Sequence, residues 1–173
     1  RLERIARAFA EFGRLPEGPS SEIDVAELVR YGASSAERPG IDVSVETEAG
    51  LPFVIGHHDA LAAALSNVIL NAIDACEGSG RITVRVGRAT LEGRDAVSIE
   101  VTDDGRGIEP DALSQIWDPY VTHKPGGTGL GLAIARQAVA LHDGTVEASS
   151  TLGEGTTIRF ILPAAAGANN GAP

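Results

Sequence analysis

Three polar side chains recur on one face of a helix predicted over residues 59–76. At about 100° per residue, Asn67, Asn71 and Asp74 fall within roughly 60° of one another. The small residues that share their side of the helix are Ala60, Ala63 and Ala64. We expect these alanines to leave room for a ligand. Amide and carboxylate oxygens are hard ligands of the kind that Mg²⁺ prefers, with water and phosphate completing its shell. A solvated helix face without a ligand is the alternative.

A carboxylate continues the apolar face of a strand predicted over residues 96–104. The alternating residues of this face are Val97, Ile99 and Val101. Asp103 keeps their parity, so it points where they point. A buried carboxylate needs hydrogen-bond donors, and the exocyclic amino group of a purine is a suitable one. Gly105 and Gly107 let the backbone approach a flat ligand closely. A strand-end turn capped by Asp103 is the alternative.

A glycine-rich stretch, THKPGGTGLGL at residues 122–132, precedes a helix predicted from about Gly129 to Leu141. It fits neither the P-loop nor the dinucleotide fingerprint. The first N–H groups of a helix are unpaired and carry the positive end of its dipole, and Lys124 adds a mobile positive charge. The stretch therefore predicts a phosphate site at the end of a lid over about residues 105–128. A flexible hinge without a ligand is the alternative.

The composition limits the classes of partner. The net charge of −10 argues against a general nucleic-acid binder or a binder of anionic membranes, so any phosphate site must be built locally. One cysteine, Cys76, excludes an internal disulfide and favours a reducing, cytoplasmic compartment. Because the first residue is not Met, we expect a fragment of a longer parent, for which an anchor in the inner membrane is compatible with this sequence.

The remaining elements must position these three features. We predict helices over 1–13, about 25–36 (capped by Asp24) and near 110–117, and strands over 41–49, 81–90, 96–104, 145–150 and 156–163. Asp59 is the predicted N-cap of the long helix. This order favours an α+β two-layer sandwich with a mostly antiparallel sheet packed on helices. We assign residues 1–19 to a helix end plus linker, 20–163 to the main domain and 164–173 to a disordered tail.

Taken together, these motifs resemble those of the GHKL superfamily. NVILNAIDA resembles its N box, DDGRGI its adenine-reading D-x-G-x-G box, IWDPYVTHK its F box, and GGTGLGL and GEGTT its later glycine boxes. The resemblance covers roughly residues 20–163 and is specific to the ATP-binding catalytic domain of bacterial sensor histidine kinases. The segments DPYVTHKPGGTGLGL and FAEFGRLPEG are most similar to nitrogen-regulation sensor kinases.

The resemblance implies a role for each matching residue. Asn71 matches the asparagine that binds Mg²⁺, and Asn67 matches the other N-box asparagine, near the phosphates. Asp103 matches the carboxylate that accepts from the adenine amino group. The further residues implied to bind ATP are Asp74, Gly105, Gly107, Ile108, Lys124, Gly127, Thr128, Gly129, Leu130, Gly131, Leu132 and Thr156. Asp74 stands where many members carry Lys, which questions a direct phosphate contact from this position.

The resemblance also implies the reaction and its partners. The domain would bind Mg–ATP and donate the γ-phosphate to a histidine on a dimerisation hairpin, which then passes it to a response regulator. The acceptor is absent, because none of the histidines, His57, His58, His123 and His142, lies in the required setting. We therefore expect no catalytic residue within this fragment, no autophosphorylation by it alone, and a homodimeric parent. The alternatives are a GHKL ATPase of the chaperone or mismatch-repair type and a nucleotide-free interaction module.

Overall fold

The computed structural model describes residues 19–122 and 127–166. The predicted helix over 1–13, His123, Lys124 and the tail from residue 167 lie outside the described residues. The elements in chain order are β1 (Ser21–Ile23), α2 (Val25–Ser34), β2 (Ile41–Thr47), β3 (Val54–Gly56), α3 (His58–Ala75), β4 (Gly80–Leu91), β5 (Arg94–Asp103), α4 (Pro110–Leu113), α5 (Gly131–Leu141), β6 (Thr145–Thr151) and β7 (Gly155–Pro163).

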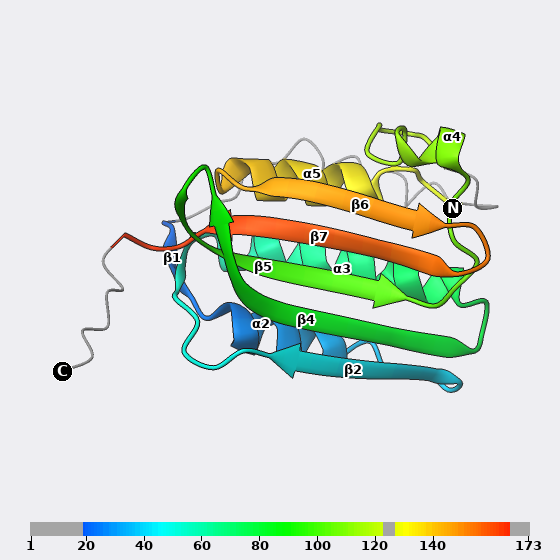
Figure 1. Cartoon of the computed structure of the whole chain (residues 1–173), viewed down its shortest axis with the longest axis horizontal. Coiled ribbons are helices and arrows are strands. Elements are labelled where there is room, and N and C mark those ends of the chain that lie inside the picture. The colour runs from blue at the N-terminus through cyan, green and yellow to red at the C-terminus, as the bar shows by residue number, and fades with distance from the viewer. Residues whose placement is uncertain (1–18, 123–126, 167–173) are drawn as a thin grey trace.

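A five-stranded sheet forms one layer, in the order β2-β4-β5-β7-β6. The β2–β4 pair is parallel and the other pairs are antiparallel. The helices α2, α3 and α5 cover one face of the sheet, and no described helix or strand covers its other face, called the open face below (Figure 1). The predicted α+β two-layer sandwich is confirmed. The strands β1 and β3 form a separate antiparallel pair that the sequence analysis did not predict.

The core lies between the sheet and the helices. From α3 it receives Leu61, Leu65, Val68, Ile69 and Ala72, which lie opposite the polar face of this helix and are all buried. From β5 it receives Val97, Ile99 and Val101, and Asp103 follows them into the buried layer with 6% of its surface exposed. The predicted parity of this strand is therefore confirmed, and the position of Asp103 follows from it.

The open face of the sheet carries a row of alternating charges. In register across all five strands lie Glu46, Arg85, Glu100, Arg159 and Glu147. Nε of Arg85 lies 2.7 Å from Oε2 of Glu46, and Nη1 of Arg159 lies 3.7 Å from Oε2 of Glu147. Directly opposite charges stabilise neighbouring strands, so this row supports the observed register.

Several element ends are confirmed and others need correction. Asp24 caps α2, accepting from the amide of Glu27 at 3.0 Å as predicted. The prediction that Asp59 caps α3 is wrong: the N-cap is His57, and Asp59 lies within the first turn. A carboxylate there meets the positive end of the helix dipole, so it interacts favourably without capping. The predicted tail begins too early, because the amides of Ala164 and Ala165 donate to the carbonyl oxygens of Asp95 and Phe53.

Candidate nucleotide site

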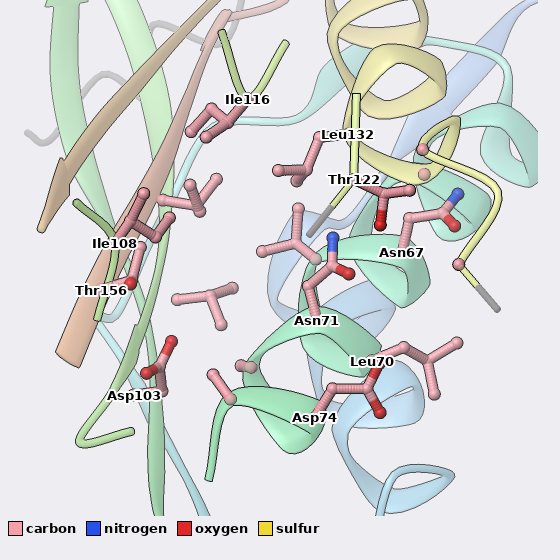
Figure 2. Close-up of a pocket in the computed structure, with 18 of the residues that line it drawn as sticks. Asn67, Leu70, Asn71, Asp74, Asp103, Ile108, Ile116, Thr122, Leu132 and Thr156 are labelled. Atoms are coloured by element: carbon pink, nitrogen blue, oxygen red, sulfur yellow. The ribbon is translucent and has the colours of Figure 1, made fainter. Parts of the chain in front are cut away.

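A cavity of about 290 Å³ opens between α3, the end of β5 and the start of α5. This volume is close to the lower end of the ~300–1,000 Å³ typical of small-molecule sites. In Figure 2, Asn67, Asn71 and Asp74 extend from α3 on one side, and Asp103, Ile108 and Thr156 lie on the other. The predicted site residues that line it are Asn67, Asn71, Asp74, Asp103, Gly107, Ile108, Gly127, Thr128, Gly129, Gly131, Leu132 and Thr156.

Three predicted site residues do not line the cavity or lie outside the described residues. Gly105 packs behind the cavity wall, where an added Cβ would lie 2.5 Å from the backbone carbonyl of Ala75. Leu130 is buried as the N-cap of α5, so it supports this wall from the core. Lys124 belongs to the segment outside the described residues, so its predicted phosphate contact stays a prediction.

The polar face of α3 forms one wall, but not for the predicted reason. Ala60, Ala63 and Ala64 do not line the cavity, and Ala64 is fully buried. Ala63 is exposed and Ala60 is partly buried, whereas α5 approaches α3 closely at Asn67, where a Cβ on Gly131 would lie within 3.1 Å of Oδ1 of Asn67. The ligand space therefore lies further along α3 than these alanines. Nδ2 of Asn67 donates to the carbonyl oxygen of Ala63 at 3.0 Å, which orients its side chain.

Asp103 lies at the deep end of the opposite wall. It is paired in register with Thr156 of β7. Its Oδ1 accepts from the amide of Gly105 at 3.0 Å, which fixes the carboxylate at the strand end. Gly107, with φ of 69°, packs so closely on the backbone at Thr151 and Leu152 that a Cβ would collide with it. This position therefore requires glycine, and the loop after Asp103 packs closely against the turn between β6 and β7.

The glycine-rich segment ends at the N-terminus of α5. Gly129 has φ of 65°, its carbonyl oxygen accepts from the amide of Tyr120 at 2.8 Å, and Oγ1 of Thr128 accepts from the amide of Leu130. The helix begins at Gly131, not at Gly129, because Gly129 has the left-handed conformation. Its first backbone bond joins the amide of Ile134 to Leu130. The preceding amides thus lie before the helical ladder, at the positive end of the dipole.

This geometry agrees with comparisons to known proteins. Residues 56–166 match the family described as histidine kinase-, DNA gyrase B- and HSP90-like ATPases. The chain belongs to this ATPase family. It is 44% identical to the sensor histidine kinase ZraS of Salmonella typhi over 167 residues, which cover 94% of this chain and 35% of ZraS. It is 31% identical to the sensory histidine kinase/phosphatase NtrB of Rhodobacter capsulatus, covering 95% of this chain and 50% of NtrB.

A solved structure supports the same assignment. The crystal structure of full-length ShkA in complex with AMPPNP has a TM-score of 0.79 to this chain at 28% identity, covering 95% of this chain and 35% of ShkA. The chain is the ATP-binding catalytic domain of the sensor histidine kinase type, as predicted. It spans about a third of the length of the ZraS proteins that it matches. The closer grouping with nitrogen-regulation sensor kinases stays a prediction.

Several side chains of this ATPase domain contribute to the site without having been predicted, among them Leu70, Ile116 and Thr122, which line the cavity, and Ser150 and Arg106. Oγ of Ser150 accepts from the amide of Ile108 at 2.8 Å, lies 2.7 Å from the carbonyl oxygen of Gly155 and lies 2.9 Å from Oγ1 of Thr156. It thereby ties the loop after Asp103 to β7. Arg106 lines the cavity, and its Nη1 lies 3.7 Å from Oε1 of Glu77 beyond the end of α3.

The single cysteine of the ATPase domain is buried behind this wall. Sγ of Cys76 lies 3.9 Å from Oδ1 of Asp104, which in turn accepts from the amide of Arg81 at 2.7 Å. Burial raises the pKa of the Cys76 thiol, and the negative charges of Asp103 and Asp104 raise it further. The thiol is therefore kept protonated and unreactive next to Asp103 and Asp104 at the C-terminal end of β5.

Proposed function

We propose that this domain binds Mg–ATP and donates the γ-phosphate to a histidine on the dimerisation hairpin of a longer parent kinase. The observation that carries this proposal is the placement of a buried carboxylate, Asp103, opposite Asn71 and the N-terminus of α5, around one cavity. The phosphohistidine would then supply an aspartate of a response regulator. We propose that the parent is a homodimer and that the domain works in the cytoplasm, where ATP and a response regulator would be available. As a separate finding, the described residues contain no helix long and apolar enough to cross a membrane.

The deep end of the cavity suits adenine. Asp103 would accept a hydrogen bond from the exocyclic amino group, and this group would meet the carboxylate in a nearly solvent-free setting. Thr156 lies in register beside it and would seat the base through water. Ile108 and the backbone at Gly107 would lie against the flat ring, since both line the same wall.

The shallow end suits the polyphosphate. Gly127, Thr128 and Gly129 line the cavity just before α5, and the amides at the helix start point outward from the positive end of the dipole. Asn67 lies directly beneath Gly131 and would orient the phosphates from below. Lys124 would add a positive charge from the neighbouring segment.

The donor set fits Mg²⁺ bound together with nucleotide. Among the described residues no group of three or more His, Cys, Asp or Glu side chains could hold a metal alone. The cavity instead offers the amide oxygen of Asn71 and the carboxylate of Asp74 on successive turns of α3. Mg²⁺ keeps several waters and binds through one or two protein oxygens plus phosphate, so this sparse set suits it. When bound, the ion neutralises charge that develops on the phosphate oxygens.

Phosphoryl transfer asks the domain mainly for positioning. The acceptor imidazole nitrogen forms the new P–N bond while the bond from the γ-phosphorus to the bridging oxygen breaks and ADP leaves. No side chain of this chain needs to act as nucleophile. The domain would hold the phosphate in line and exclude water, which alone lowers the barrier considerably. Leu70, which lines the cavity, and Tyr120, whose amide donates to the carbonyl oxygen of Gly129, are 46% and 58% exposed and would contact the acceptor hairpin.

Calorimetric titration with ATP and ADP, with and without Mg²⁺, tests this proposal. We expect Asp103→Ala to weaken binding of every adenine nucleotide by about 10- to 100-fold, because a buried charged hydrogen bond is lost. Asn71→Ala should chiefly remove the Mg²⁺ dependence. The control Thr83→Ala, on the open face of the sheet, should bind normally. Absence of both heat and thermal shift with Mg–ADP would instead support the nucleotide-free interaction module.

The ATPase alternative makes a different prediction. Enzymes of the chaperone or mismatch-repair type resemble this chain but place a glutamate base where Asn67 stands. An amide cannot accept a proton from the attacking water, and Nδ2 of Asn67 is already committed to Ala63. We therefore expect nucleotide binding with very little turnover by this fragment. Sustained multi-turnover release of phosphate by the pure protein would favour the alternative.

A further inference from the structure

Asp74 places a negative charge on the cavity wall one helical turn beyond Asn71. Both side chains line the cavity from α3 (Figure 2). The spacing of three residues puts them on the same face of the helix. A carboxylate in this place lies close to any phosphate that approaches Asn71. Its charge must therefore affect how a polyphosphate enters the site.

Two of the three ionisable side chains among the described residues that line the cavity are carboxylates. The three are Asp74, Asp103 and Arg106. The charge of Arg106 is partly met by Glu77, at 3.7 Å, which does not line the cavity. The proposed role of Asp103 is to accept a hydrogen bond from the adenine amino group. Asp74 has no such role, and its negative charge beside the phosphates would repel them.

We propose that Asp74 makes triphosphate binding conditional on a divalent cation. This inference rests on the proposed nucleotide function. Without metal, the full negative charge of ATP meets the Asp74 carboxylate at short range, and binding is disfavoured. With Mg²⁺, part of that charge is cancelled, and the same carboxylate attracts the cation, either directly or through water. Asp74 thus discriminates between metal-free and metal-loaded nucleotide, while Asn71 supplies the metal ligand.

The proposal assigns different effects to neighbouring residues. Loss of the Asn71 amide should weaken binding of Mg–ATP. Loss of the Asp74 charge should instead strengthen binding of metal-free ATP. Adenosine carries no phosphate, so its binding should be unaffected by Asp74 and should still depend on Asp103. These three patterns distinguish the metal ligand Asn71, the repulsive charge of Asp74 and the adenine-binding carboxylate of Asp103.

The experiment measures dissociation constants for ATP in Mg²⁺ and in EDTA, and for adenosine, with wild type, Asp74→Asn and Asp74→Lys. We expect metal-free ATP to bind about three- to tenfold more tightly to Asp74→Asn than to wild type, from removal of one nearby charge, and more tightly still to Asp74→Lys. The ratio of metal-free to Mg²⁺-bound dissociation constants should fall in the same order. Adenosine affinity should stay constant, and thermal unfolding should show that each variant is folded.

Asp59→Asn is the matched control, because it removes the same charge from the first turn of the same helix, away from the cavity. The ratio of the metal-free to the Mg²⁺-bound dissociation constant for ATP should be the same in Asp59→Asn as in wild type. An unchanged ratio in both Asp74 variants would overturn the inference, and so would an equal gain with Asp59→Asn, which would indicate a general charge effect. Failure of wild type to bind adenosine or Mg–ATP at all would instead overturn the proposed function.

Discussion

The imidazole of His142 joins the end of α5 to the start of α3 through the backbone of His57. Nε2 of His142 accepts from the amide of His57 at 2.8 Å, and Nδ1 lies 2.7 Å from the carbonyl oxygen of Ala138. Nδ1 must therefore carry the proton, and the ring is neutral in this arrangement. Because His57 is the N-cap of α3 and His142 the C-cap of α5, this buried ring fastens the two helices that border the nucleotide cavity.

Replacing His142 should destabilise the domain without touching the cavity. His142→Ala leaves the partly buried amide of His57 and the buried carbonyl of Ala138 without this partner. We expect a loss of about 2–4 kcal/mol in the free energy of unfolding, measured by urea denaturation. The exposed neighbour provides the control: His58→Ala should change stability by less than about 0.5 kcal/mol. Equal free energies of unfolding for His142→Ala and His58→Ala would show that the ring of His142 does not stabilise the contact between α5 and α3.

Gly56 should tolerate a methyl group only when the ring of His142 is absent. A Cβ at position 56 would collide with the imidazole of His142. We expect Gly56→Ala to destabilise wild type strongly, and to cost much less in the background of His142→Ala. Chemical denaturation of the two single variants and the double variant measures this coupling. Strictly additive changes in the free energy of unfolding would contradict the predicted contact.

Removing the hydroxyl of Ser150 should loosen the adenine end of the cavity. This hydroxyl accepts from Ile108 and lies within hydrogen-bond distance of Gly155 and Thr156. We expect Ser150→Ala to lower stability by about 1–2 kcal/mol and to weaken ADP binding several-fold. Ser149 points to the opposite face of the sheet, so Ser149→Ala is the control for both measurements. Normal ADP affinity in Ser150→Ala would restrict this residue to a role in stability.

The Cys76 thiol should make the domain less stable at alkaline pH. Its pKa in the folded state is raised above the ordinary value of 9.0 by burial and by the charges of Asp103 and Asp104. The unfolded chain therefore releases this proton first as the pH rises. The contribution of the thiol is complete below about pH 9 and is lost as pH rises through the folded pKa. Between about pH 8 and pH 10, wild type should lose more unfolding free energy than Cys76→Ala. Parallel pH profiles would contradict this.

The sequence predicted the elements whose patterns are long and regular. The alternation that ends in Asp103 placed this carboxylate correctly, and the period of α3 separated its core side from its polar side. It missed β1 and β3, since three-residue strands are too short to show an alternation. The parallel pairing of β2 with β4 also has no local signal, because it depends on the crossover between them.

Within the candidate site, sequence motifs predicted residues that line the cavity themselves. They did not predict Ser150, which only holds such lining residues in place. Asn71 and Asp103 belong to recognisable motifs, and both line the cavity. Ser150 lies in a strand whose sequence carries no functional motif. Its contacts to Ile108 and Thr156 form only when the distant segments are brought together by folding. The alanines of α3 show the reverse error. The ligand space lies further along the helix than Ala60, Ala63 and Ala64, and their small size does not indicate this displacement.

The alternating charges across the open face also bear on how the chain assembles its sheet. A slip of β5 by two residues would move Glu100 away from Arg85 and Arg159 at once and place it opposite Thr83 or Gly87 on one side. Each misaligned intermediate therefore lacks pairs on two strands together. Since β7 joins β5 from a distant part of the chain, such a slip is a kinetic trap available to this pairing. The row should shorten the lifetime of this trap and thereby speed the search for the native register.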